Sequence, residues 1–254
     1  SVNVSFVGKY VDLKDAYFSL TEALDHAGIN NDTKVNINFV NSDELNNKNY
    51  SSKLKKSDAI LVPGGFGGRG IEGMILAAKY AREKKVPYFG ICLGLQIAII
   101  EIARNLCRLK DANSTEFKPR TKHKVISLIT EWKNEDGSIE KRDKNSDKGG
   151  TMRLGAQKAK LKKNSLAHKL YKKTNIFERH RHRYEVNPEY VSELEKKGLL
   201  ISARSEIHNL VEIIGIKDHP WYLGCQFHPE FTSKPKTGHP LFNDFIKTAV
   251  KLKR

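Results

Sequence analysis

A cysteine flanked by glycines is the side chain of this sequence best suited to nucleophilic chemistry. In Gly90-Ile91-Cys92-Leu93-Gly94 an apolar strand ends and a helix begins at once. So tight a turn needs glycines around the central residue, and it exposes that side chain at the carboxyl end of the strand. The helix N-terminus then favours a thiolate. We therefore interpret Cys92 as a nucleophile, and Cys107 and Cys225 as structural cysteines, the usual fate of a free thiol.

A thiol nucleophile needs a base, and the base needs a partner that fixes its tautomer. His228-Pro229-Glu230 follows an apolar strand and supplies both groups. In an extended segment, residues two apart project to the same side, so Glu230 can orient His228 toward Cys92. A metal site at these two residues is disfavoured, because no further ligand stands at suitable spacing nearby. The other histidines considered are interpreted as surface or packing residues: His26, His123, His168, His208 and His219.

A glycine-rich segment, Gly64-Gly65-Phe66-Gly67-Gly68-Arg69-Gly70, follows another apolar strand. Its backbone N–H groups could cradle a phosphate or form an oxyanion hole, and a plain flexible turn is the third possibility. The P-loop pattern is absent, because no Lys-Ser or Lys-Thr follows the glycines. An oxyanion hole suits a cysteine nucleophile, and its expected donors are the N–H groups of Gly65 and Leu93.

Short apolar strands alternate with amphipathic helices along the chain, which predicts an α/β fold with an open, mostly parallel sheet flanked by helices. The expected strands cover residues 2–7, 34–39, 59–62, 88–91, 124–129, 199–203, 210–214 and 222–227. The expected helices cover residues 17–27, 71–84, 93–106, 165–171, 188–197 and 241–252. Residues 133–148 are rich in Lys, Asn, Asp and Glu and predict a flexible surface insertion. We see no domain boundary, and expect one domain over residues 1–254.

The composition limits the classes of partner. The formal charge is +16, but 33 Lys against 12 Arg, scattered along the chain, indicate a solvated surface rather than a nucleic-acid groove reader. No apolar run is long enough to span a membrane. Three unevenly spaced cysteines argue against a disulfide framework and for a reducing, cytoplasmic setting. The first residues read directly as a strand without an initiator Met, from which we infer a domain cut out of a longer protein.

Several motifs together carry a family resemblance. They are Pro63-Gly64-Gly65, Gly90-Ile91-Cys92-Leu93-Gly94-Leu95-Gln96, Asn113-Ser114-Thr115-Glu116-Phe117, Arg179-His180-Arg181-His182-Arg183-Tyr184 and Gln226-Phe227-His228-Pro229-Glu230. This set resembles the class I glutamine amidotransferases, which share a flavodoxin-like fold, and most closely the glutaminase domains of CTP synthases. The resemblance covers nearly the whole chain.

The resemblance implies a role for each matching residue. Cys92, His228 and Glu230 would be the catalytic triad, and Gly65 and Leu93 the oxyanion donors. The remaining glutamine contacts would be Phe66, Gln96, Glu116, Arg183 and Tyr184. Charge makes this sensible, since Glu116 can pair with the ammonium of glutamine and Arg183 with its carboxylate. Arg69, Gly70 and Glu72 fall where the family responds to GTP, its allosteric activator.

The resemblance also implies partners. The substrate would be L-glutamine, and its ammonia would pass to a synthetase domain that binds ATP, Mg²⁺ and UTP and that nothing in this sequence resembles. The domain itself would need no cofactor, and the full-length protein would form a homotetramer. Two alternatives stay open: the glutaminase of another amidotransferase such as GMP synthetase, and a non-catalytic basic binding module.

Overall fold

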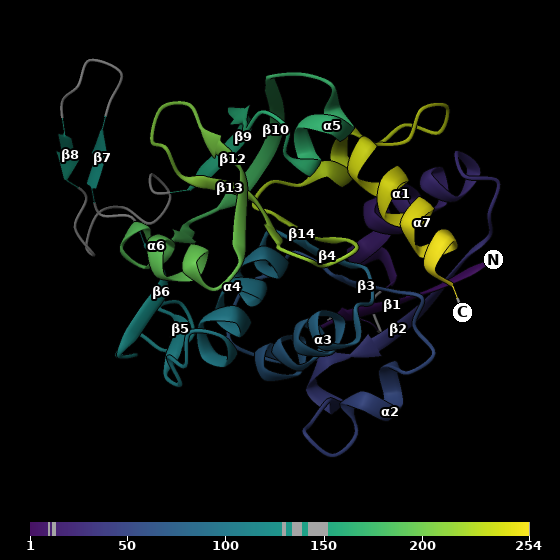
Figure 1. Cartoon of the computed structure of the whole chain (residues 1–254), viewed down its shortest axis with the longest axis horizontal. Coiled ribbons are helices and arrows are strands. Elements are labelled where there is room, and N and C mark those ends of the chain that lie inside the picture. The colour runs from purple at the N-terminus through teal and green to yellow at the C-terminus, as the bar shows by residue number, and fades with distance from the viewer. Residues whose placement is uncertain (10, 12–13, 129–130, 134–138, 142–151, 254) are drawn as a thin grey trace.

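The structure is a computed structural model, and it describes all residues except 10, 12–13, 129–130, 134–138, 142–151 and 254 (Figure 1). The strands are β1 (Val2–Gly8), β2 (Val35–Asn41), β3 (Ala59–Val62), β4 (Tyr88–Ile91), β5 (Ala112–Ser114), β6 (His123–Leu128), β7 (Glu131–Lys133), β8 (Ile139–Lys141), β9 (Arg153–Leu161), β10 (Asn175–His182), β11 (Tyr184–Val186), β12 (Leu199–Ser205), β13 (Val211–Ile216) and β14 (Tyr222–Cys225). The α-helices are α1 (Phe18–Ile29), α2 (Tyr50–Leu54), α3 (Ile71–Lys84), α4 (Leu93–Asn105), α5 (Leu166–Tyr171), α6 (Pro188–Lys196) and α7 (Pro240–Leu252).

Within the described residues, nine strands form one sheet in the order β10-β9-β12-β13-β14-β4-β3-β1-β2. The strands from β14 to β2 pair in parallel, and those from β14 to β10 pair antiparallel. Strands β3, β4 and β14 are buried along their whole length, as expected for parallel strands covered on both faces. The predicted α/β class, an open sheet with a parallel core flanked by helices, is confirmed.

The sheet separates two apolar cores. Buried side chains of α3 and α4 pack with Ile60 and Tyr88 on one face, and those of α1 and α7 pack with Leu61 and Phe89 on the other. The successive residues of β3 and β4 therefore serve opposite cores, as the pleat of a strand requires. Figure 1 shows α1 and α7 side by side, apart from α3 and α4. Both faces are covered, so the carboxyl ends of the parallel strands remain as the place for a site.

Several elements differ from the sequence-based expectation. Strand β14 ends at Cys225, two residues earlier than predicted, because the chain turns before His228. The short helix α2 and the strands β5, β9, β10 and β11 were not expected, since β9 and β10 are rich in charged and polar residues and the others are very short. Most of the predicted flexible insertion, residues 134–138 and 142–148, lies outside the described residues. Its other members belong to the two-stranded pair β7 and β8.

A search of the described helices for one both long and apolar enough to cross a membrane finds none.

Helix α4 lies unusually close to β3, and glycine makes this possible. A Cβ placed on Gly94 would stand 2.2 Å from the carbonyl oxygen of Val62, far inside van der Waals contact. We predict that Gly94→Ala lowers the free energy of unfolding by about 1–3 kcal/mol, because the helix must move off the sheet. Urea denaturation measures this. The control is Gly68→Ala, whose new Cβ would lie 3.7 Å from Phe117. Equal stability of the two variants would contradict the prediction.

Candidate active site

Cys92 occupies the sharp turn between β4 and α4. Its backbone has φ 52° and ψ −99°, a conformation that L-residues rarely adopt and that costs on the order of 1–3 kcal/mol. The turn is held because the Cys92 N–H donates to the Cys225 carbonyl oxygen at 2.7 Å, which ties it to the neighbouring strand β14. The side chain is 3% exposed, and its sulfur lies at the first turn of α4. Cys107 and Cys225 have no such backbone, and burial raises the pKa of both thiols.

The structure brings His228 and Glu230 to Cys92. The Nδ1 atom of His228 lies 2.7 Å from Oε1 of Glu230, and His228 and Cys92 both adjoin Gly64, close enough for the sulfur to attract the charged ring. The expected reason for the His–Glu contact, an extended segment, is wrong. A 3-10 helix, η3 (Pro229–Thr232), starts directly after His228, so the carboxylate reaches the imidazole around a helical turn. The backbone N–H of His228 also donates to the Arg179 carbonyl oxygen at 2.8 Å, which anchors the turn to β10.

Electrostatics favour the charged form of His228. Burial opposes the imidazolium, but attraction to Cys92 and hydrogen bonds with Cys92 and Glu230 outweigh it and raise the pKa of His228 to about 10. A protonated His228 beside the Cys92 sulfur is the arrangement that an acyl-transfer nucleophile requires, because the imidazolium can stabilise a thiolate and later supply a proton.

The glycine-rich segment after β3 lies against this pair. A Cβ on Gly64 would stand 2.8 Å from Cε1 of His228, so only glycine fits there without displacing the imidazole. Gly65 lies beside Leu93, the first residue of α4, where backbone N–H groups lack partners within the helix. These two expected oxyanion donors thus lie next to each other beside Cys92.

Lys9 holds the glycine-rich segment in place through hydrogen bonds to its backbone, a role that the sequence did not predict. Its buried ammonium donates to the carbonyl oxygen of Phe66 at 2.9 Å and to that of Gly67. Burial lowers the pKa of Lys9 to about 8, although attraction to Glu116 partly offsets it. In the sequence, Lys9 directly follows a strand, and nothing there assigned it a role.

The residues expected to contact glutamine gather on one side of this segment. Glu116 accepts the Gly67 N–H at 2.8 Å; burial raises the pKa of Glu116, while Lys9 and Arg183 act against that rise. Burial and the nearby negative charge of Glu116 raise the pKa of Tyr184. Gln96 is buried and donates to the Tyr184 carbonyl oxygen at 3.0 Å. Phe66 is 43% exposed at the segment's tip. The guanidinium of Arg183 thus lies close enough to the Glu116 carboxylate to attract its charge, next to the glycine-rich segment.

The three residues expected to respond to GTP lie at the start of α3. The guanidinium of Arg69 donates to the Lys9 carbonyl oxygen at 2.7 Å. Gly70 has φ 69° and precedes the helix. Glu72 accepts two hydrogen bonds from Arg104, at 2.8 and 3.0 Å. Their response to GTP stays a prediction.

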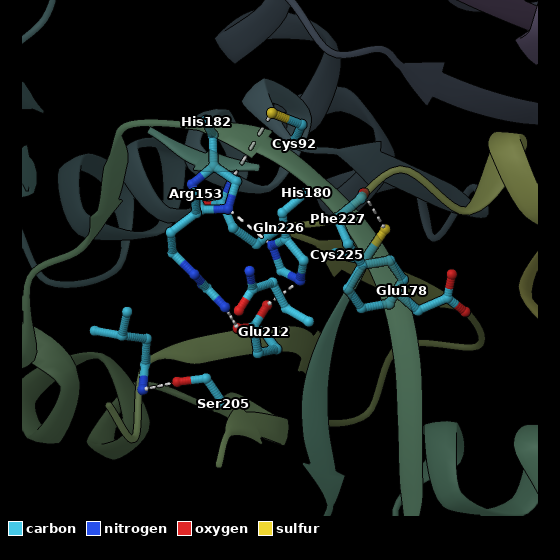
Figure 2. Close-up of polar contacts among 12 residues, drawn as sticks. Cys92, Arg153, Glu178, His180, His182, Ser205, Glu212, Cys225, Gln226 and Phe227 are labelled. Atoms are coloured by element: carbon cyan, nitrogen blue, oxygen red, sulfur yellow. Dashed lines mark hydrogen bonds and ion pairs between the residues drawn. The ribbon is translucent and has the colours of Figure 1, made fainter. Parts of the chain in front are cut away.

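A buried polar cluster lies next to the site, and no sequence pattern predicted it. Arg153 donates to Glu185 at 2.9 Å and to Glu212 at 2.7 Å. The Nδ1 atom of His180 lies 2.9 Å from Nε2 of His182, at hydrogen-bonding distance (Figure 2). Burial raises the pKa of both carboxyl groups and, together with Arg153, lowers the pKa of both histidines. The alternation of burial along β10 separates these neutral histidines from the exposed Arg179 and Arg181, so the run is not the solvated strand that its composition suggests.

A second missed network ties the end of the chain to the site. Glu178 accepts from Tyr171 at 2.8 Å and from Thr232 at 3.2 Å, and it binds His239 at 2.9 Å. Thr232 belongs to η3, so Glu178 helps to hold the turn that carries His228. The only sequence signal was His239 before Pro240, a pattern typical of a helix start.

Known proteins share this fold and this arrangement of motifs. The profile of the family "Glutamine amidotransferase class-I" matches residues 12–248, and the chain belongs to this family. More particularly, it is similar to the Trypanosoma brucei CTPS glutaminase domain with bound acivicin: 38% identity and a TM-score of 0.88, over 99% of this chain and 94% of that one. The predicted resemblance to CTP synthase glutaminase domains is thereby confirmed, as is the prediction of an amidotransferase enzyme domain.

More distant structures share the fold alone. A glutamine amidotransferase from Thermotoga maritima is 9% identical with a TM-score of 0.50, over 100% of this chain and 99% of that one. Another, from Methylobacillus flagellatus, is 12% identical with a TM-score of 0.53, over 91% of this chain and 71% of that one.

The charge state of His228 can be tested directly. Because attraction to Cys92 is the largest influence that raises the pKa of His228, Cys92→Ala should lower that pKa toward or below its ordinary value of 6.5. Histidine NMR titration of the two proteins measures the change. The folded-state pKa exceeds the unfolded value, so the associated stability is complete below about pH 6.5 and is lost as pH rises through about 10. An identical midpoint in the two proteins would contradict the assignment.

Proposed function

We propose that this domain hydrolyses the side-chain amide of L-glutamine to glutamate and ammonia. The observation that carries the proposal is the proximity of Cys92 and His228, with Glu230 2.7 Å from the imidazole and Gly64 against both residues. Membership of the class-I glutamine amidotransferases supports the same conclusion.

Glutamine would bind with its charged end between Glu116 and Arg183. The carboxylate of Glu116 pairs with the ammonium group, and the guanidinium of Arg183 pairs with the carboxylate. Gln96, Phe66 and Tyr184 would border the side chain and direct its amide toward Cys92. Glu116 accepts the Gly67 N–H, so the ammonium group would share a carboxylate that is already oriented.

The chemistry would proceed in two halves. The Cys92 thiolate forms a bond to the amide carbon. The resulting oxyanion accepts hydrogen bonds from the N–H groups of Gly65 and Leu93. His228 gives its proton to the departing nitrogen, the C–N bond breaks, and a glutamyl thioester remains. Neutral His228 then takes a proton from water as the oxygen attacks. The C–S bond breaks, glutamate leaves, and thiolate and imidazolium are restored.

The ammonia would serve a synthetase domain, where ATP, with Mg²⁺, activates UTP for amination to CTP. The similarity to the T. brucei CTPS glutaminase domain supports this choice over GMP synthetase and over a non-catalytic basic module. We propose that GTP activates the domain through Arg69, Gly70 and Glu72, that the full-length protein is a cytoplasmic homotetramer, and that this domain needs no cofactor of its own.

The nucleophile is tested by substitution and by trapping. Cys92→Ala should reduce glutamine hydrolysis by at least about 1,000-fold, because the thioester can no longer form. Acivicin, the ligand of the T. brucei domain, should add to Cys92 and leave Cys107 and Cys225 unmodified. Peptide mass spectrometry locates the adduct. In the protein that also carries a synthetase domain, the variant should still use free ammonia. Loss of activity with both nitrogen sources would refute the role.

The glutamine contacts are tested at Glu116. Glu116→Gln should raise the KM for glutamine by about tenfold or more, because a charge-assisted hydrogen bond to the ammonium is worth about 1.5–3 kcal/mol. Steady-state glutaminase kinetics measure this, with Glu193→Gln on the exposed face of α6 as the matched control. If both variants keep the wild-type KM, Glu116 does not bind the substrate.

A further inference from the structure

A fully buried amide, that of Gln226, contacts the sulfur of Cys92. The Nε2 atom of Gln226 donates to Sγ at 3.8 Å (Figure 2). Gln226 follows β14 and is 0% exposed. Its backbone N–H donates to the Glu212 carbonyl oxygen at 2.9 Å, so the residue is fixed to β13 as well. Nothing in the reaction described above uses this side chain.

Neighbouring groups determine which end of the Gln226 amide meets the sulfur. The Tyr184 carbonyl oxygen can only accept, so the group that Gln96 presents to it at 3.0 Å is Nε2. The same Nε2 lies 3.4 Å from the Gln226 side chain, which must therefore offer its oxygen to Gln96. The Gln226 NH₂ group is left to face Cys92. Two amides thus connect a backbone carbonyl of β11 to the sulfur, and each step has one allowed direction.

We propose that Gln226 is a second hydrogen-bond donor to the Cys92 sulfur, besides His228, and that it stabilises the thiolate at both points of the reaction where the sulfur carries charge. This inference rests on the proposed function for the identity of the nucleophile. The sulfur is anionic before it attacks glutamine and again when it leaves the thioester. His228 must give up a proton in the first half and take one in the second. An amide does neither, so its N–H group stays in place throughout.

The groups around the sulfur make a neutral donor valuable. The titratable groups that face Cys92 are His228 from the segment after β14 and Cys225 from β14 itself. Glu230 stands behind His228, and His180 and His182 of β10 lie near His228 without carrying charge. The nearest residues of the segment after β3 and of the first turn of α4, Gly64, Gly65, Leu93 and Gln96, are uncharged. When His228 is neutral, Gln226 is thus the remaining side-chain donor to the sulfur among the described residues.

The test measures thiolate formation without glutamine. Iodoacetamide alkylates Cys92 as the thiolate, and mass spectrometry of the Cys92 peptide follows its rate separately from Cys107 and Cys225. Gln226→Leu should slow this alkylation about tenfold at neutral pH and raise its pH midpoint by about one unit, as expected for loss of a donor to an anion. Gln226→Glu keeps the shape but sets a carboxylate against the sulfur, so its midpoint should rise further.

Two comparisons make the outcome decisive. Gln157→Leu makes the same change on β9, where the amide donates to the Leu154 carbonyl oxygen, and should leave the midpoint unchanged. A merely structural role for Gln226 would reduce the fraction of Cys92 that reacts without moving the midpoint. Wild-type midpoints in both folded Gln226 variants would overturn the proposal. Failure of Cys92→Ala to abolish glutamine hydrolysis would instead refute the proposed function, and the alkylation midpoint would still report on Gln226.

Discussion

The parallel alignment of β3, β4 and β14 is the constraint on which the site depends. These strands are paired with one another in register, so the segments that follow them leave the sheet at the same edge. One segment is rich in glycine, one turns at Cys92, and one carries His228. Cys92 and His228 are far apart in the chain, and no local interaction could bring them together. Because both strands are buried on both faces, a shift in register would cost the two apolar cores before it affected the chemistry.

The turn at Cys92 stores a local conformational cost that the surrounding contacts balance. Its left-handed backbone is fixed by the hydrogen bond to Cys225 and by the close approach of α4 to β3. The charge of His228 shows a similar balance of opposing effects. Burial alone would lower the pKa of His228 and favour the neutral imidazole, but the neighbouring sulfur and carboxylate keep it protonated. The backbone strain at Cys92 and the buried charge of His228 are each unfavourable alone, and the contacts around them offset both costs. Such contacts require rigid surroundings, and the site residues accordingly lie at the ends of strands.

Local pattern predicted the parallel half of the sheet, and in the antiparallel half it predicted β12 and β13 but missed β9 and β10. Strands β3 and β4 are short, purely apolar runs bounded by turn residues, and their limits were predicted correctly. The second half of β10 alternates arginine with histidine. Its buried side is polar because Arg153 of β9 and Glu212 of β13 lie against it. That partnership is set by tertiary structure alone. Lys9 and Gln226 were missed for the same reason: their partners, a pair of loop carbonyls and a sulfur, adjoin them only in the folded chain.

The hydrogen bond from the His228 backbone to Arg179 joins the histidine to the outermost strand of the antiparallel half. The sulfur belongs to the parallel half. The chain of His228 leaves β14, the neighbour of β4, so the imidazole is held from two sides of the sheet. A molecule bound on β10 would load the Arg179 anchor and so bear on the imidazole without touching the sulfur or the glycine-rich segment.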